Sequence, residues 1–253
     1  MNIILITQDD TFYLPDNIDY LIRGFPDDSR IVAAVLLDAS PFGGKKGFIT
    51  KAKETYAIFG TGFFIRYAYK FCINKIILRR SVRTTLNRHA IKILEISDIN
   101  SDSSLNLINS YKPDLLISIA GNQIFKKPLI QLANKGLLNL HTALLPKYRG
   151  LMPSFWVLKN KEEYTGVSVF FVDEGIDSGP ILVQKKISIG NKTQSDLIKE
   201  TKKLGMDAII EAVKLIGSGI YELIDNDDAK MTYYSFPTKK DVNEFRKAGK
   251  RFY

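Results

Sequence analysis

Residues 115–119 read LLISI, a short apolar run without the polar alternation of a half-exposed strand. Similar runs occur at Ile3–Ile6 and Ile31–Leu37. Runs of this length that are rich in Ile, Leu and Val are typical of strands buried on both faces of a parallel sheet. We therefore expect an α/β fold in which helices cover both faces of the sheet.

The flanking sequence extends the same pattern. Further strands are expected at Leu137–Leu140, Gly166–Phe171 and Ile181–Ile187. Helices are expected at Asn17–Gly24, Ser101–Tyr111 and Pro128–Lys135, and a long helix at Ser195–Ile216 is followed by a Gly-Ser-Gly stop. In the tail, Thr238 can cap a short final helix, with Asp241 three residues on. The order of elements predicts a Rossmann-like, doubly wound and mostly parallel sheet with a short C-terminal extension.

Composition limits the chemistry that the chain can perform. The 253 residues include 36 Lys and Arg against 27 Asp and Glu, a formal net charge of +9. Cys72 is the one cysteine, and His89 and His141 are the two histidines. An internal disulfide, a cysteine-based zinc site and a multi-histidine metal centre are therefore excluded, and no metal is expected. The sequence shows no basic leader and no apolar run near the roughly 18 residues of a membrane span, so we expect a cytoplasmic protein.

Positive charge is concentrated in residues 45–92, which we call the basic aromatic segment. Twelve bases face one acid, Glu54, so this segment carries +11 and the rest of the chain −2. The bases are Lys45, Lys46, Lys51, Lys53, Arg66, Lys70, Lys75, Arg79, Arg80, Arg83, Arg88 and Lys92. Such a segment could hold phosphates, nucleic acid or an anionic membrane surface. A helical segment with core aromatic rings and a solvated basic face explains the pattern equally well.

A second feature is a pair of polar residues at the end of a predicted strand. Asn139 and His141 are two positions apart, so their side chains project to the same face. Parallel sheets bind ligands at the carboxyl ends of their strands. The acidic, glycine-containing loop at 172–180 lies between two predicted strands and can return a carboxylate to this edge. An isolated Asn–His pair is more often a structural hydrogen bond beside an exposed ring, so the flanking sequence decides between the two interpretations.

Residues 139–150 read Asn-x-His-x-x-Leu-Leu-Pro-x-Tyr-x-Gly, and residues 172–180 read Val-x-x-x-Ile-Asp-x-Gly-Pro. This pair of motifs resembles the folate-dependent formyltransferases, which include glycinamide ribonucleotide transformylase, methionyl-tRNA formyltransferase and the sugar N-formyltransferases. The resemblance covers about residues 110–190. It implies the formyltransferase fold, a catalytic domain at 1–190 with the basic aromatic segment as an insert, and a C-terminal helix and packed tail at 191–253. It also implies N10-formyltetrahydrofolate as the formyl donor.

The resemblance further implies that Asn139, His141 and Asp177 are the catalytic residues. Formyl transfer to an amine passes through a tetrahedral intermediate that bears an oxyanion. The Asn139 amide and a protonated His141 can donate hydrogen bonds to that oxygen. The Asp177 carboxylate would favour the protonated imidazole and could help to remove the proton of the attacking amine. His89 matches no motif, and we expect it to be a surface residue.

By similarity to the family, two segments should bind the pterin-like ring of the donor, mainly through backbone groups. They are Gly121, Asn122, Gln123 and Ile124 after one strand, and Val172, Asp173, Glu174, Gly175 and Ile176 after another. Gly121 permits the close approach of a flat heterocycle.

The departures from the family concern the formyl acceptor. Gln8, Asp9 and Asp10 stand where the ribonucleotide transformylases have a Gly- and Ser-rich phosphate loop, and they suit an amine or sugar hydroxyls. About 63 residues follow the family-like core, which leaves little room for the β-barrel domain of the methionyl-tRNA enzymes. The resemblance is therefore greatest to the sugar N-formyltransferases.

The expected acceptor is an anionic nucleotide-linked amino sugar of surface polysaccharide biosynthesis. Tyr148, Arg149 and Gly150, together with the basic aromatic segment, would bind it. Glycinamide ribonucleotide or another small amine is the alternative acceptor, and a non-catalytic binding protein on the same fold is the alternative class. No nucleic-acid partner is expected, whereas a weak contact with an anionic membrane surface and a homodimer stay open.

Overall fold

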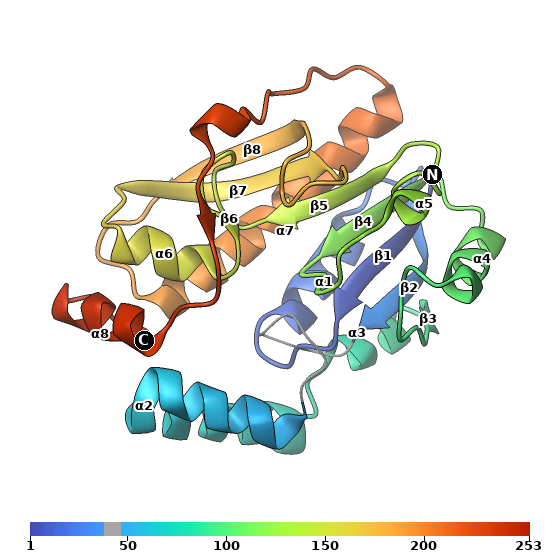
Figure 1. The fold of residues 1–253 in the computed structure, drawn as a ribbon. Helices are drawn as coiled ribbons and strands as arrows, with labels where there is room; N and C mark the ends of the chain where they lie inside the picture. Colours follow the sequence, from blue (N-terminus) through green and yellow to red (C-terminus); the bar gives the residue numbers. More distant parts are fainter. Residues whose placement is uncertain (38–46) are drawn as a thin grey trace.

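The computed structural model describes residues 1–37 and 47–253. Within these residues, a seven-stranded sheet with the order β3-β2-β1-β4-β5-β7-β8 forms the centre of the molecule (Figure 1). The strands are β1 (Asn2–Gln8), β2 (Arg30–Leu37), β3 (Lys92–Leu94), β4 (Leu115–Ile119), β5 (Leu137–His141), β7 (Tyr164–Phe171) and β8 (Ile181–Ser188). The five strands from β3 to β5 are parallel, and β7 and β8 are antiparallel to their neighbours. This confirms the predicted α/β class and mostly parallel sheet.

Helices surround the sheet, and a small second sheet lies beside it. The helices are α1 (Leu14–Gly24), α2 (Phe48–Cys72), the π-helical η1 (Ile73–Ile77), α3 (Val82–Arg88), α4 (Asp102–Ser110), α5 (Lys127–Ile130), α6 (Pro153–Lys159), α7 (Gln194–Ser218), the 3-10 helix η2 (Asp228–Lys230) and α8 (Lys239–Lys247). The second sheet pairs β6 (Arg149–Gly150) with β9 (Tyr233–Tyr234) in parallel. None of the helices in the described parts of the chain has both the length and the apolar character to cross a membrane.

Strand β1 shows why its sequence is continuously apolar. Ile3 and Leu5 pack into a core cluster that contains residues of α1, α3 and α7. Ile4 and Ile6 point the other way, into a cluster with Ile108 of α4. Because helices cover both faces of the sheet, side chains on both sides of the strand are buried. A polar residue at every second position would therefore be buried against one of the two helical layers.

Helix α7 begins and ends as its sequence indicates. Thr193 and Asp196 form a capping box at its start, and Gly219 ends it with a left-handed φ of 70°. The helix predicted at 128–135 is wrong beyond Ile130, where turns follow α5. The chain must reverse there to enter β5, and Gly136 makes that reversal with a φ of 86°.

The basic aromatic segment is helical over most of its length, as one of the two interpretations predicts. Helix α2 is broken at Gly60, where φ is 77°. Beside this break, Phe59 and Phe63 pack against Phe252 of the tail, with ring centroids 5.7 and 5.1 Å apart. The lysines at 45 and 46 lie outside the described residues. In Figure 1, α2 lies beyond the end of the sheet, next to α8 and the C-terminus.

Candidate active site

The structure brings His141 and Asp177 together, although 36 positions separate them in the sequence. The imidazole Nδ1 lies 3.6 Å from Asp177 Oδ2, and Nε2 lies 2.7 Å from the Tyr148 carbonyl oxygen. Since a carbonyl oxygen only accepts, the Nε2 hydrogen is donated to Tyr148. The same Asp177 oxygen accepts a 2.9 Å hydrogen bond from the Gly150 N–H. His141 is buried and Asp177 is half-buried, so their interaction is only weakly screened by water.

Antiparallel pairing gives the Asp177 loop an unexpected path. Phe171, at the end of β7, pairs with Leu138 near the amino end of β5. The loop at 172–180 therefore starts at the edge opposite to His141 and folds back to reach it. Asp177 adopts a left-handed φ of 50° in this loop, which is uncommon for a residue other than glycine.

Asn139 lies two residues before His141 on β5, so the alternation of the strand gives both side chains the same face. Its side chain is half-buried, unlike the buried leucines on either side. The Asn139 side-chain amide forms no hydrogen bond with any residue in 1–37 or 47–253. The amide can therefore donate to a bound substrate without breaking an existing contact.

A buried residue that the sequence motifs do not include supports the Asp177 loop. The Asn226 side chain donates to the carbonyl oxygens of Asp177 and Gly179, at 2.9 and 2.8 Å. Its own oxygen accepts from the Arg149 guanidinium at 3.0 Å. Asn226 lies in a run of aspartates that has the composition of a solvated turn, and no local pattern marks it.

The two predicted donor-binding segments are held on either side of β5. In the first, Gln123 donates to the Ser97 carbonyl at 3.1 Å and accepts from the Ile99 N–H at 3.1 Å, and Ile124 is largely exposed. Lys127 follows this segment and lies 3.9 Å from Glu174 of the second. This contact connects the residues that follow the first segment to the second segment.

Backbone geometry restricts side chains within these segments. A Cβ at Gly121 would lie 2.7 Å from the Ser118 hydroxyl, so only glycine fits without a shift. Asn122 is half-buried, whereas Gly175 is exposed and donates its N–H to Asp173 at 3.0 Å.

A cavity of about 470 Å³ adjoins the second segment. It is lined by Gly175 and Ile176, and by Arg149 from the predicted acceptor group. Val172, at the start of the same loop, faces inward and packs against the core under β4 and β5. One open surface therefore joins part of the predicted donor site to part of the predicted acceptor site.

Other predicted acceptor residues make contacts within the protein. Asp10 accepts hydrogen bonds from the backbone N–H groups of Phe12, Tyr13 and Leu14 at 3.1, 2.7 and 2.9 Å, and so orders the turn that leads into α1. Asp9 accepts from the Arg83 N–H at 3.3 Å. Gln8, which precedes them at the end of β1, is half-buried.

Tyr148 and Arg149 also have partners within the protein. The Tyr148 hydroxyl donates to Glu162 at 2.6 Å, and burial followed by this hydrogen bond raises the pKa of Tyr148. Arg149 is buried and pairs with Asp228 at 2.7 Å. Gly150 contributes its N–H to Asp177, as described above, rather than a contact made by a side chain.

His89, which we expected at the surface, is half-buried and has a partner within the protein. Its Nε2 lies 2.8 Å from Asp19 of α1, and the imidazole is 23% exposed. The pairing holds α3 against α1, far along the chain, which is why no local pattern reveals it. Among the described residues, no three His, Cys, Asp or Glu side chains gather closely enough to bind a metal ion.

Comparisons with known proteins agree with this arrangement. A sequence model described as formyl transferase matches residues 82–213, just over half of the chain. The methionyl-tRNA formyltransferase of Kosmotoga olearia is 33% identical over 162 residues, which are 64% of this chain and 52% of that protein. The chain thus spans about half the length of the curated relatives it matches.

Solved structures share the fold. The N-formyltransferase from Helicobacter canadensis, in complex with folinic acid and dTDP-3-aminofucose, superposes with a TM-score of 0.63 at 17% identity, over 98% of this chain and 80% of that one. The phosphoribosylglycinamide formyltransferase from Anaplasma phagocytophilum gives 0.62 at 14% identity, over 93% and 99%. At such identities the likeness concerns the fold alone, whereas the sequence model covers His141 and Asp177 themselves. The chain belongs to the formyl transferase family.

Proposed function

We propose that this protein transfers a formyl group from N10-formyltetrahydrofolate to the amine of an anionic, nucleotide-linked amino sugar. The observation that carries the proposal is the convergence of Asn139, His141 and Asp177. An amide donor, an imidazole and a carboxylate on one face of the sheet are the groups that amine formylation requires, and no metal or covalent enzyme intermediate is needed.

The residues between β4 and β5 fit a flat heterocyclic donor. The Ser118 hydroxyl is buried and has no hydrogen-bond partner among the described residues. Gly121, next to it, keeps the backbone free of a Cβ. Main-chain groups at 120–124 can therefore approach a pterin-like ring closely. The donor, once bound, supplies an activated one-carbon unit, and the structural relative from Helicobacter canadensis holds folinic acid.

The side chains have separate roles in transfer. The Asn139 amide donates to the formyl oxygen as negative charge develops on it. When His141 is protonated, it carries a hydrogen on Nδ1 as well as on Nε2. The Nδ1–Asp177 distance of 3.6 Å exceeds that of a hydrogen bond, so this second hydrogen can be shared with the formyl oxygen. Asp177 stabilises the positive ring and accepts the amine proton directly or through water. When the bond between the formyl carbon and N10 breaks, that proton passes to N10 and tetrahydrofolate leaves.

The positive charge of the basic aromatic segment supports an anionic acceptor. Residues 47–92 carry ten bases against one acid. The relative from Helicobacter canadensis holds dTDP-3-aminofucose, which supports a nucleotide-linked amino sugar here. Methionyl-tRNA and glycinamide ribonucleotide are the competing acceptors, because other relatives carry those activities in their names.

The test is to incubate the protein with N10-formyltetrahydrofolate and each candidate acceptor, and to follow the release of tetrahydrofolate. Acceptors would be UDP- and dTDP-linked amino sugars, glycinamide ribonucleotide and methionyl-tRNA. We expect turnover with an amino sugar, and His141→Asn should lower it by about 100-fold or more.

His89→Asn is the matched control, because it changes the other histidine in the same way. It should retain the wild-type rate. Equal rates for His141→Asn and wild type would reject the catalytic assignment. Turnover with glycinamide ribonucleotide or methionyl-tRNA, and with no amino sugar, would reject the proposed acceptor.

A further inference from the structure

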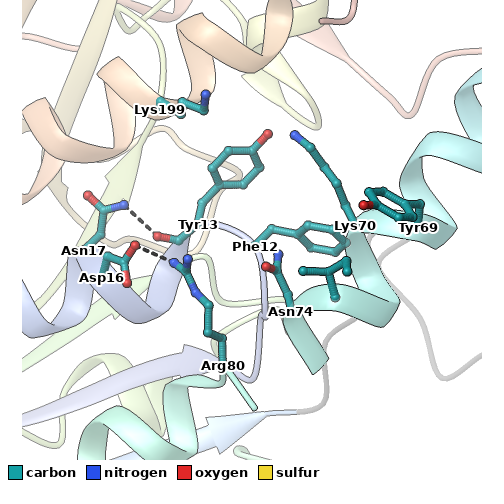
Figure 2. Close-up of a pocket in the computed structure, with 10 residues that line it drawn as sticks. Phe12, Tyr13, Asp16, Asn17, Tyr69, Lys70, Asn74, Arg80 and Lys199 are labelled. Carbon is teal, nitrogen blue, oxygen red and sulfur yellow. Dashed lines mark hydrogen bonds and ion pairs between the residues drawn. The ribbon is translucent and has the colours of Figure 1, made fainter. Parts of the chain in front are cut away.

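A second cavity, of about 400 Å³, opens between the start of α1, the end of α2, η1 and α7 (Figure 2). Its volume lies within the range of small-molecule sites. Nine of its ten lining residues precede residue 82, where the family match begins. Membership of the family therefore assigns no role to this cavity.

The cavity has more positive than negative charge. Lys70, Lys199, Arg80 and Asp16 are its charged residues. Arg80 forms an ion pair with Asp16 in the wall, as Figure 2 shows. Neither Lys70 nor Lys199 has a carboxylate within ion-pair distance in residues 1–37 and 47–253. Two ammonium groups from different helices therefore point toward one space, and neither of them forms an ion pair there.

The environment of Lys70 shows the cost of this arrangement. Burial lowers the pKa of Lys70, and the neighbouring cations Arg66 and Lys199 lower it further, while Asp196 acts in the opposite direction. An anion placed between the two lysines would replace this repulsion with attraction.

Aromatic and amide groups complete the wall. The Phe12 ring packs against Tyr67, with centroids 4.9 Å apart, and Figure 2 shows it beside Asn74 and below the Lys70 side chain. Tyr69 is 67% exposed. A planar base can stack on such rings, and the Asn74 carboxamide offers both a donor and an acceptor to the edge of a base.

The cavity lies beside the edge of the sheet at which the catalytic residues are found. Ile6, Ser118 and Asn139 are Cα partners across β1, β4 and β5. Gln8 and His141, each two residues further on, therefore end at the same level of the sheet. Two strand spacings separate them by about 10 Å. Phe12 follows Gln8 by four residues, so the cavity borders the same edge.

We propose that this cavity binds a nucleoside diphosphate, with the diphosphate between Lys70 and Lys199 and the base against the Phe12 and Tyr69 rings. The inference rests on the proposed function, because the attached amino sugar would then extend along the sheet edge toward His141. Within the basic aromatic segment, the proposal assigns acceptor binding to the junction of α2 and η1.

The test measures binding of dTDP and UDP, without a sugar, by calorimetry. Lys70→Ala/Lys199→Ala should weaken binding about 100-fold, since each lysine contributes a charged hydrogen bond. Lys53→Ala/Lys203→Ala is the matched control, because it removes one lysine from each of the same two helices outside the cavity. The control should bind within about twofold of wild type.

Two results would overturn the proposal. One is an equal loss in both double variants, which would mean general attraction and no site. The other is unchanged binding in the cavity variant. Binding of 5-formyltetrahydrofolate, measured in parallel, keeps the two proposals apart. A protein that binds the nucleoside diphosphate but not the folate would contradict the proposed function and leave this cavity assignment standing.

Discussion

Asn226 connects the loop at 172–180, which carries Asp177, to Arg149 of β6. Its side chain, 6% exposed, bonds the backbone of the Asp177 loop on one side and Arg149 on the other. The left-handed backbone of Asp177 is held by these bonds and by the contact of its carboxylate with Gly150. We therefore regard Asn226 as a positioning residue that acts through Asp177.

Replacing Asn226 with Ala should lower kcat about 10-fold or more, with little change in the KM of the acceptor. The change removes the donor for two carbonyl oxygens and leaves the Arg149 guanidinium with one partner fewer. A small displacement of Asp177 from His141 is enough to slow the chemistry. Steady-state kinetics measures the split between kcat and KM.

Asn226→Asp separates positioning from the contact with Arg149. A carboxylate still accepts from Arg149 but cannot donate to the carbonyl oxygens of Asp177 and Gly179. Its kcat should fall as far as that of the Ala variant. A normal kcat in either variant, with the fold intact by circular dichroism, would refute the positioning role.

At the level of residues, the sequence predicted what lies within short motifs. The shared face of Asn139 and His141 follows from strand alternation alone. Asp177 was identified through its motif, and the structure places it beside His141. The contact of Arg149 could not be predicted, because Asp228 is about 80 positions away. The contacts of Asp10 are local, with backbone N–H groups two to four residues on, but we expected this residue only to bind the acceptor.

The C-terminal elements are attached to the body through an aromatic cluster. Phe245 of α8 stacks on Phe155 of α6 and on Phe252, with centroids 4.8 and 4.7 Å apart. The carbonyl oxygens of Arg251 and Phe252 accept the first N–H groups of α7. The C-terminal residues thereby provide hydrogen-bond acceptors for backbone N–H groups that have no partner within the first turn of α7.

Asp241, at the start of α8, makes this attachment depend on pH. Burial alone would raise the pKa of Asp241, but hydrogen bonds from Thr238 and from Lys159 outweigh it and hold the pKa below its ordinary value. A lowered folded-state pKa means that the ionised carboxylate stabilises the fold above the unfolded pKa of about 3.9. This stabilisation is lost as the pH falls through the folded pKa.

Asp241→Asn should therefore lower the free energy of unfolding by about 1 kcal/mol at neutral pH. The gap from wild type should close as the pH falls below about 4. Urea unfolding at a series of pH values measures both. Asp27→Asn, in an exposed loop, is the control, because it removes the same charge. This variant should show no such gap. A gap that stays constant into acid would contradict the role of the ionised carboxylate.

Elements were predictable where local chemistry decides them. The apolar runs that form β1, β2 and β4 follow from burial on both faces, and Thr238 caps α8 as its sequence indicates. The antiparallel direction of β7 and the pairing of β6 with β9 were not predictable, because they depend on contacts between distant segments. The folded-back path of the Asp177 loop follows from that direction.

At the level of the whole molecule, the concentrated positive charge and the catalytic residues lie on different elements. The bases of residues 47–92 lie on α2, on η1, in the turn between η1 and α3, on α3 itself and at the start of β3. His141 and Asp177 lie on β5 and in the loop after β7. An anionic ligand is therefore attracted first to the basic side, with its uncharged end left to approach the catalytic residues.

This separation predicts how binding depends on salt. The association rate of dTDP should fall about 10-fold between about 0.05 and 0.5 M salt, because the Debye length shrinks well below the size of the basic surface. Thymidine carries the same base without charge, so its association rate should hardly change. Stopped-flow fluorescence of the two ligands measures the difference. Parallel salt dependences would show that the attraction is not electrostatic, and would place the origin of nucleotide affinity in the aromatic rings of the cavity instead.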